Sequence, residues 1–202
     1  MGADGEGAAL AAVTGQAMAI TNSATHFGLV SKFFHWAVFL LFANQYLTGV
    51  LMMRMERGHA VLGYAQGDFY TWHKSVGLVI LALVLLRITW RKTTRLPDWP
   101  ATLASWEQSA MKWTERVLYL CMFLMPLSGY VFTLAGGFNF KLFGVVPLPQ
   151  LIAKDHAIAT TAEFTHAATA FLIVATVALH LALGFKRHLV DKDSFLRRML
   201  PF

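Results

Sequence analysis

Eight histidines are the residues of this chain best suited to chemistry, and four of them fall within or at the edge of long apolar runs. Ionisable side chains in such runs are costly and usually functional, and a neutral imidazole nitrogen is a common ligand of zinc, copper and iron. Any one of them could instead be a hydrogen-bonded histidine that packs between helices. The four in apolar runs are His35, His73, His166 and His180, and those expected to be solvated in tails or loops are His26, His59, His156 and His188.

The runs around these histidines have the length and composition of membrane spans. Of the 202 residues, 56% are apolar and only 14% are charged, against roughly a quarter charged in an ordinary soluble domain. Three runs carry no Asp, Glu, Lys or Arg and exceed the roughly 20 residues that cross a bilayer as a helix; a fourth qualifies if Lys74 and Arg87 extend toward opposite interfaces. The sequence predicts an all-α integral membrane four-helix bundle, with helices at 32–54, 72–90, 113–135 and 162–187.

Positive charge is distributed unevenly between the two sides of the predicted bundle. The side with both termini and the loop between the second and third helices carries 12 cations, and the other side carries 5. The positive-inside rule therefore predicts that both termini are cytoplasmic. The net charge of +6 suits an anionic lipid surface, so the expected partner is the lipid bilayer and not nucleic acid.

With this orientation, the four histidines fall at two depths. His35 and His180 lie near the inner ends of the first and fourth helices, and His73 and His166 lie near the outer ends of the second and fourth. His166 and His180 are 14 residues apart, which places them about 40° apart around a helix and about 21 Å apart along it. The sequence therefore offers one inner pair and one outer pair.

Two imidazoles at each depth suffice for haem but not for zinc. Zinc needs three or four protein ligands, and the nearby acids, such as Glu163, lie only at the rim. Haem iron needs two axial ligands, because the porphyrin supplies four. The single cysteine, Cys121, excludes both a disulfide framework and the C-x-x-C-H attachment of c-type haem. We therefore expect two His–haem–His sites, with irons roughly 20 Å apart, as an electron path across the membrane.

Residues near these histidines could accommodate and balance the haem groups. Gly77 and Gly49 share helix faces with His73 and His35 respectively, and either could let a flat macrocycle approach the backbone or simply allow close helix packing. Arg87 is predicted to reach the inner depth and pair with an inner haem propionate, the alternative being an interfacial anchor. Lys74 could serve the outer propionates or attract an anionic reactant, the alternative being simple extension to the interface.

An ordered set of short motifs resembles the bacterial cytochrome b561 family over about residues 26–200. The set comprises Phe34-His35-Trp36, Trp72-His73-Lys74-Ser75-Val76-Gly77, Leu118-Tyr119, Pro126-Leu127-Ser128-Gly129, the His166 to His180 spacing, and Phe195-Leu196-Arg197-Arg198-Met199-Leu200. One departure is Trp113-Thr114-Glu115-Arg116, where relatives often carry a histidine, so a proton or quinone role tied to that position does not transfer.

The resemblance implies a multi-pass cytochrome of the bacterial inner membrane that holds two haem b groups on the four histidines, in the same pairing. Family members pass electrons between a periplasmic donor, either a small molecule or a redox protein, and the quinone pool. At least one branch oxidises superoxide and reduces ubiquinone. The implied activity is that of an electron carrier or a quinone-reducing oxidoreductase of the superoxide oxidase type.

The expected domain organisation follows from these assignments. A flexible N-terminal tail (1–31) precedes the four-helix transmembrane cytochrome b domain (32–190), and a cytoplasmic C-terminal tail (191–202) follows it. Within the domain, 136–161 is expected to be a long outer loop.

Other functions use the same residues differently. A cytochrome b anchor subunit of a larger respiratory dehydrogenase or hydrogenase would share the haem sites. A histidine-based metal or proton transporter would need polar groups at the midplane and usually shows repeats or broken helices, which this sequence lacks. A purely structural subunit leaves the four-histidine pattern unexplained.

Overall fold

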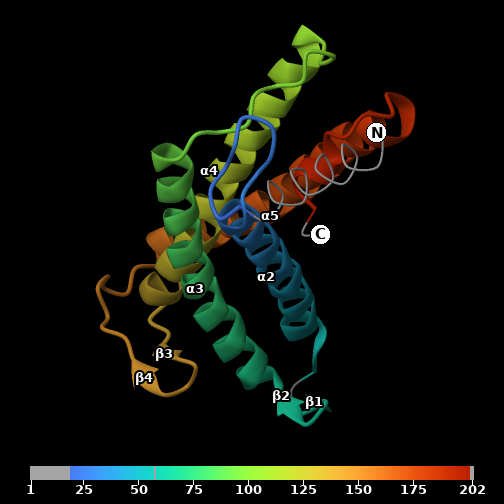
Figure 1. Cartoon of the computed structure of the whole chain (residues 1–202). Coiled ribbons are helices and arrows are strands. Elements are labelled where there is room, and N and C mark those ends of the chain that lie inside the picture. Colours follow the sequence, from blue (N-terminus) through green and yellow to red (C-terminus); the bar gives the residue numbers. More distant parts are fainter. Residues whose placement is uncertain (1–18, 57, 201–202) are drawn as a thin grey trace, which may run out of the picture. The chain divides into compact units, whose positions relative to one another are not determined.

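Four long helices dominate the protein. The computed structural model describes residues 19–56 and 58–200, so residues 1–18 of the predicted N-terminal tail lie outside the described residues. Each long helix is apolar and long enough to cross a membrane, which confirms the predicted all-α four-helix membrane architecture. The helices are α2 (Leu29–Arg54), α3 (Gln66–Thr93), α4 (Ser105–Ala135) and α5 (His156–Phe185) (Figure 1).

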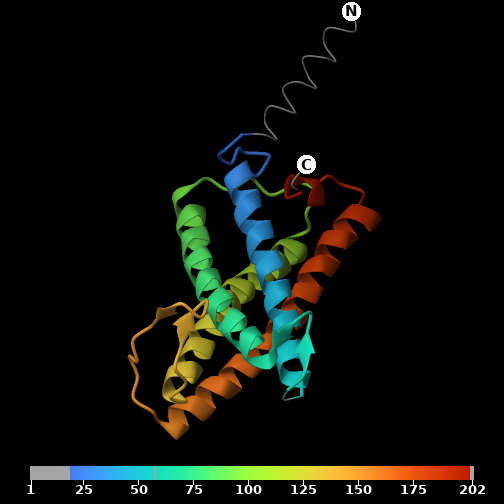
Figure 2. The same cartoon turned by 90° about the horizontal axis from the view of Figure 1, so that it is seen from below.

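Short hairpins and turns complete the secondary structure (Figure 2). Antiparallel strands β1 (Ala60–Val61) and β2 (Tyr64–Ala65) connect α2 to α3. A second antiparallel pair, β3 (Lys141–Leu142) and β4 (Val146–Pro147), lies between α4 and α5, in the predicted outer loop. After α5 come a π-helical turn, Lys186–Val190, and a 3₁₀ turn, Leu196–Arg198.

All four helices begin earlier than the uncharged runs suggest, and polar capping residues lie at the starts of α3 and α5. The Asp155 carboxylate accepts a hydrogen bond from the Ile158 N–H at 2.9 Å, which caps the first turn of α5 and makes His156 helical rather than part of a loop. Asp68 accepts from the Ala65 N–H at 2.8 Å at the start of α3. Uncharged runs therefore marked the membrane cores of the helices but not their ends.

The helices pack in two compact units, and each helix contributes a segment to both. Of the described residues, unit 1 comprises 19–37, Leu86–Arg116 and 177–200, and unit 2 comprises 38–56, 58–85 and Val117–Thr176. Large apolar side chains along the spans remain exposed, for example Phe164 and Phe171 at 74% each. Such a surface suits contact with lipid acyl chains, since hydrocarbon is as apolar as the side chains themselves.

In unit 1, a buried ion-pair network joins the end of α5 to the start of α4. Arg187 and Glu107 are each only 2% exposed, and Arg187 Nη1 lies 3.3 Å from Glu107 Oε2. The Arg187 guanidinium also donates to Thr102 Oγ1 at 2.8 Å and pairs with Asp193. Lys186 pairs with Glu107 as well. Because removing one member leaves uncompensated buried charge, this network fixes the chain after α5.

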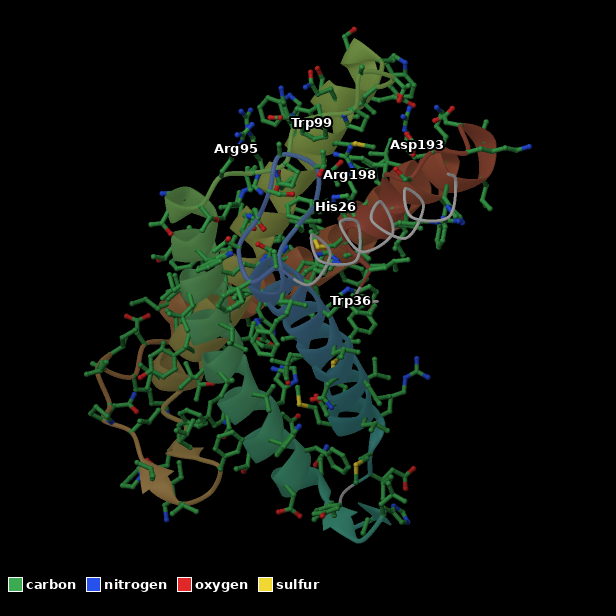
Figure 3. The ribbon with its side chains drawn as sticks, viewed as in Figure 1. His26, Trp36, Arg95, Trp99, Asp193 and Arg198 are labelled. Carbon is green, nitrogen blue, oxygen red and sulfur yellow. The ribbon has the colours of Figure 1, made fainter. Side chains whose placement is uncertain are left out.

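Described residues of the predicted C-terminal tail belong to unit 1 and contact its other segments (Figure 3). The rings of Phe195 and Trp99 stack with centroids 6.2 Å apart, Arg198 Nη1 donates to the Asp98 carbonyl at 2.8 Å, and Trp36 Nε1 donates to the Met199 carbonyl at 2.9 Å. The hydrogen bond between Trp36 and Met199 therefore links the tail to the residue that follows His35.

Beyond the end of the α5 span, Lys186 also donates to Asp191 at 2.9 Å. This hydrogen bond lowers the pKa of the Asp191 carboxyl below its usual range. A carboxyl with a lowered folded-state pKa stabilises the fold at neutral pH, and its contribution is lost as the pH falls through that pKa. The contact is therefore weakened by acid.

Replacing Arg187 tests whether the buried network stabilises the fold. Arg187→Met leaves Glu107 and Asp193 without their guanidinium, and we expect the apparent melting temperature in detergent to fall by about 10 °C. Arg95→Met is the matched control, because Arg95 pairs with Asp98 on the surface at 3.1 Å and such pairs contribute little. Equal melting temperatures for the two variants would contradict a stabilising role for the network.

Candidate haem sites

His73 of α3 and His166 of α5 face each other within unit 2. Their ring centroids are 6.2 Å apart and the ring planes are inclined at 73°. Both side chains are half-buried, and His73 is also held through its backbone, since Gln45 Nε2 donates to the His73 carbonyl at 2.7 Å. The two predicted outer histidines are therefore brought together.

Hydrogen bonds at the Nδ1 atoms orient both of these rings. His166 Nδ1 lies 2.8 Å from the Met125 carbonyl, which can only accept, so Nδ1 carries the proton. His73 Nδ1 lies 3.2 Å from Thr48 Oγ1, and the Thr48 hydroxyl donates to the Asn44 carbonyl at 3.0 Å, so its oxygen is the acceptor from His73. Both rings then carry their lone pair on Nε2, the arrangement typical of histidine metal ligands.

Glycines give these two rings their space. A Cβ placed on Gly129 of α4 would lie 2.8 Å from His166 Cε1 and 2.9 Å from its Nδ1, closer than a side chain tolerates. Gly129 is one helical turn after Met125, so the missing side chain allows the imidazole to reach the Met125 carbonyl. A Cβ on Gly49 would lie 3.5 Å from His73 Cε1, an ordinary contact.

His35 of α2 and His180 of α5 form the second pair, within unit 1. Their centroids are also 6.2 Å apart, with ring planes inclined at 45°. Trp36 packs edge-on against His35 with centroids 5.6 Å apart. His35 Nδ1 lies 3.2 Å from Arg87 Nη2, and because a guanidinium only donates, this Nδ1 is the acceptor.

The spacing of both pairs fits two axial ligands on one metal ion. With a metal–nitrogen bond of about 2 Å and a nitrogen-to-centroid distance of about 1.2 Å, two opposed imidazoles have centroids about 6.4 Å apart. Among the described residues, no group of three or more His, Cys, Asp or Glu side chains could hold a metal ion. Two-ligand sites match haem, which supplies the other four donors.

The protonation state of His35 Nδ1 determines whether Arg87 can keep its hydrogen bond to this ring when His35 binds a metal. A neutral histidine that binds a metal through Nε2 carries its proton on Nδ1, so Arg87 and His35 Nδ1 cannot then share this hydrogen bond. A propionate carboxylate of haem would offer the guanidinium an acceptor with the geometry that arginine prefers. The donor set of this pair fits haem once Arg87 turns to such an acceptor.

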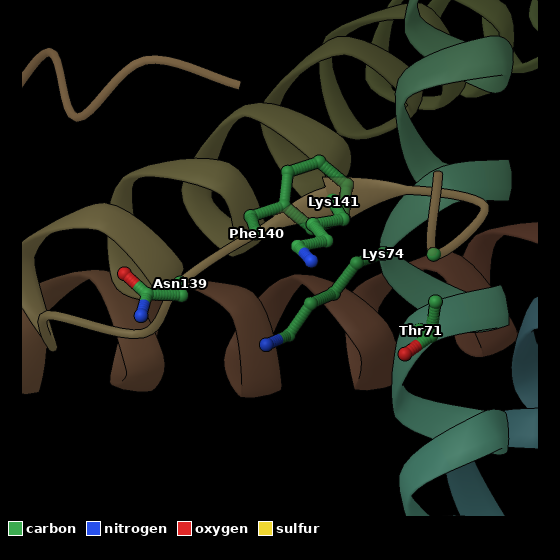
Figure 4. Close-up of a pocket in the computed structure, with 6 residues that line it drawn as sticks. Thr71, Lys74, Asn139, Phe140 and Lys141 are labelled. Atoms are coloured by element: carbon green, nitrogen blue, oxygen red, sulfur yellow. The ribbon is translucent and has the colours of Figure 1, made fainter. Parts of the chain in front are cut away.

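A small pocket beside α3 in unit 2 carries two cations (Figure 4). Its volume is about 180 Å³, and polar groups of Thr71 and Asn139 line it together with Lys74 and Lys141. The Lys74 ammonium also lies 5.2 Å from the centroid of the Phe138 ring. Lys74 directly follows His73 in the chain, so one residue of the pocket lining is the sequence neighbour of a histidine of the pair.

Sequence reasoning placed the histidines and missed several of their partners. The residues identified only from the structure are Gln45, Thr48, Met125 and Gly129. Of these, Gly129 stands in the Pro126-Leu127-Ser128-Gly129 motif, so the motif could have indicated that this glycine lies near a histidine. An added Cβ on Gly77 would lie 3.4 Å from Gln45 Nε2 of the neighbouring helix, which fits the alternative of close helix packing, and its role beside haem stays a prediction.

Four apolar spans and two facing imidazole pairs define a membrane b-type cytochrome. The family model for prokaryotic cytochrome b561 matches residues 26–202, and the chain belongs to that family, as the sequence motifs predicted. It is therefore a multi-pass bacterial membrane protein that binds haem b and functions in electron transfer. The chain is also similar to cytochrome b561 homolog 2 of Escherichia coli (strain K12), with 27% identity over 186 residues, covering 91% of this chain and 95% of that protein.

Adding a methyl group at Gly129 tests the packing of His166. Gly129→Ala should displace the His166 ring and lower the haem b content of the purified protein, measured as haem per chain by the pyridine haemochrome assay. Gly49→Ala is the control, because its methyl group fits at 3.5 Å from His73. Alanine favours a helix over glycine by about 1 kcal/mol, so a loss confined to Gly129→Ala cannot come from helix propensity. Full haem content in that variant would contradict the proposed contact.

Proposed function

We propose that this protein carries two haem b groups, one between His73 and His166 and one between His35 and His180. It would transfer electrons from a periplasmic donor to the quinone pool of the bacterial inner membrane, with both termini cytoplasmic. The observation that carries the proposal is the repeated 6.2 Å spacing of two imidazole pairs. When bound, the haem irons supply one-electron redox chemistry, and the protein supplies ligation, orientation and access.

The donor side of the proposal rests on the pocket with Lys74 and Lys141. Two ammonium groups in one small opening attract an anion. A small anionic one-electron donor fits this chemistry, and superoxide is the candidate that the family resemblance suggests. Lys74 could instead hold a haem propionate, in which case Lys141 alone would attract the donor.

The acceptor side rests on the cations near His35. Arg87 would hold a propionate of the His35/His180 haem, as argued from its guanidinium. Arg91 of α3 pairs with Glu115 of α4 at 2.7 Å, and Arg116 of α4 lies over the Trp113 ring at 5.0 Å. Both arginines therefore lie in the parts of α3 and α4 that belong to unit 1. We place quinone reduction, with ubiquinone as acceptor, at this side.

With superoxide as the donor, electrons and protons balance in the overall reaction. Two superoxide ions each lose one electron and become dioxygen. One ubiquinone gains these two electrons and two protons, taken from the cytoplasmic phase, and becomes ubiquinol. No further oxidant or reductant is needed.

Histidine variants test the haem assignment. Purified wild-type protein should contain two haem b per chain, with a low-spin spectrum. His180→Ala and His73→Ala should each reduce this to about one, because each removes an axial ligand from a different pair. His156→Ala is the control, since this exposed side chain lies outside both pairs, and it should keep two. A wild-type ratio of one, or unchanged ratios in both ligand variants, would refute the assignment.

Lysine variants test the anionic donor. Lys74→Met and Lys141→Met should each lower the second-order rate constant of haem reduction by superoxide about threefold and weaken its dependence on ionic strength. Lys154→Met changes the net charge equally but does not line the pocket, so it serves as the matched control. Equal rates in all three variants would refute a donor site at this pocket.

A further inference from the structure

We propose that the hairpin of β3 and β4 positions Lys141 at the pocket beside α3, and that Ser75 and Trp72 of α3 hold the hairpin there. All of these residues lie in unit 2. The inference rests on the proposed donor site at this pocket and extends it to the residues that assemble the site. Ser75 and Trp72 act through Lys141, so they are positioning residues.

Two segments that are far apart in the sequence form the pocket (Figure 4). Thr71 and Lys74 come from α3, whereas 139–141 and Gly144 come from the hairpin and the residues just before it. No Asp or Glu is found among the described residues that line the pocket. The second ammonium group therefore reaches the pocket only while the hairpin lies against α3.

A buried hydroxyl joins the turn of the hairpin to α3. The Phe143 N–H donates to Ser75 Oγ at 2.7 Å, and the Ser75 hydroxyl donates to the Thr71 carbonyl at 2.7 Å. Ser75 is 0% exposed, so water does not compete for its oxygen. Loss of this hydroxyl would leave the Phe143 N–H without its acceptor, which is costly where water has little access.

The backbone of the turn is shaped for docking on α3. Its central residues, Phe143 and Gly144, have φ angles of 49° and 75°, and turns of this kind usually carry Asn or Gly at both positions. A phenylalanine at positive φ is strained and needs compensating contacts. The Phe143 ring meets Trp72 with centroids 5.8 Å apart, and Trp72 Nε1 donates to Asn44 Oδ1 at 3.1 Å, so the compensating contact is itself fixed.

The start of the hairpin is fixed on a different helix. Phe140 is 5% exposed, and its ring centroid lies 6.5 Å from that of Tyr130 of α4. Its carbonyl also accepts a hydrogen bond from the Leu148 N–H at 3.0 Å. Lys141 therefore lies between a buried residue packed on α4 and a turn docked on α3.

The sequence Trp72-His73-Lys74-Ser75 then has one combined role. A single turn of α3 carries a candidate haem ligand, one cation of the pocket, and the two residues that hold the second cation in place. Positioning Lys141 through this turn keeps both ammonium groups in register with His73, which two independent surface lysines would not do.

Hydrogen exchange of the full-length holoprotein in detergent tests the docking without any electron donor. Ser75→Ala should speed exchange of the Phe143 amide about tenfold, because it loses its acceptor. Phe143→Asn suits the positive φ of the turn but removes the ring, and should speed exchange across 141–147. Val145→Ala is the matched control, since Val145 lies in the same hairpin and is 78% exposed, and it should leave exchange unchanged.

Rates of haem reduction by superoxide test whether the docking acts through Lys141. Ser75→Ala should slow the reaction about threefold, as expected for Lys141→Met. The double variant Ser75→Ala/Lys141→Met should be no slower than Lys141→Met alone, because both changes remove the same ammonium group from the pocket. A hydroxyl that acted on His73 instead would slow both backgrounds equally.

Faster exchange, a slower reaction and no further loss in the double variant together support the inference. Unchanged exchange or an unchanged rate in Ser75→Ala, or a further loss in the double variant, overturns the inference alone. Lys74→Met and Lys141→Met variants that react as fast as Lys154→Met refute the donor site and the inference with it. If Ser75→Ala loses haem, Phe143→Asn decides through the same exchange and rate measurements, because this change lies outside α3.

Discussion

The contact on which the rest of this chain depends is the facing of two imidazoles at each of two places in an apolar bundle, with ring centroids 6.2 Å apart. A buried ring nitrogen without a partner is costly, so each ring also needs a partner for Nδ1. In unit 2 these partners are a backbone carbonyl and a hydroxyl that is itself satisfied. The identities of Thr48 and Gly129 in the neighbouring helices follow from this requirement, whereas Met125 contributes only its backbone carbonyl.

Unit 1 meets the same constraint with charge and with the C-terminal segment. Trp36 contacts the His35 ring and donates to the Met199 carbonyl, so the segment after α5 is connected directly to the ligand region of α2. The Arg187 network holds the start of that segment. A region that the sequence suggested was a tail is therefore part of the packing around one histidine pair.

The sequence was sufficient for features that depend on hydropathy, charge and spacing. Uncharged runs located the spans. The depths of the histidines predicted the two histidine pairs, whose ring centroids lie 6.2 Å apart. It was insufficient where the outcome depends on which face a helix turns to its neighbour. Gly49 shares a face with His35 along α2, yet it lies against His73, because 14 residues along a helix carry it to another depth. Helix starts were missed because capping residues such as Asp155 resemble loop residues in composition.

The two histidine pairs have equal centroid spacing, but their ring planes are inclined at 73° and 45°, and different groups meet their Nδ1 atoms. In unit 2 the Nδ1 atoms meet a hydroxyl and a backbone carbonyl, and in unit 1 the Arg87 guanidinium lies 3.2 Å from His35 Nδ1. Dipolar groups act over short distances, whereas a charge persists over several ångströms in a medium of low dielectric constant. The two pairs therefore differ in their surroundings more than in the spacing of their rings.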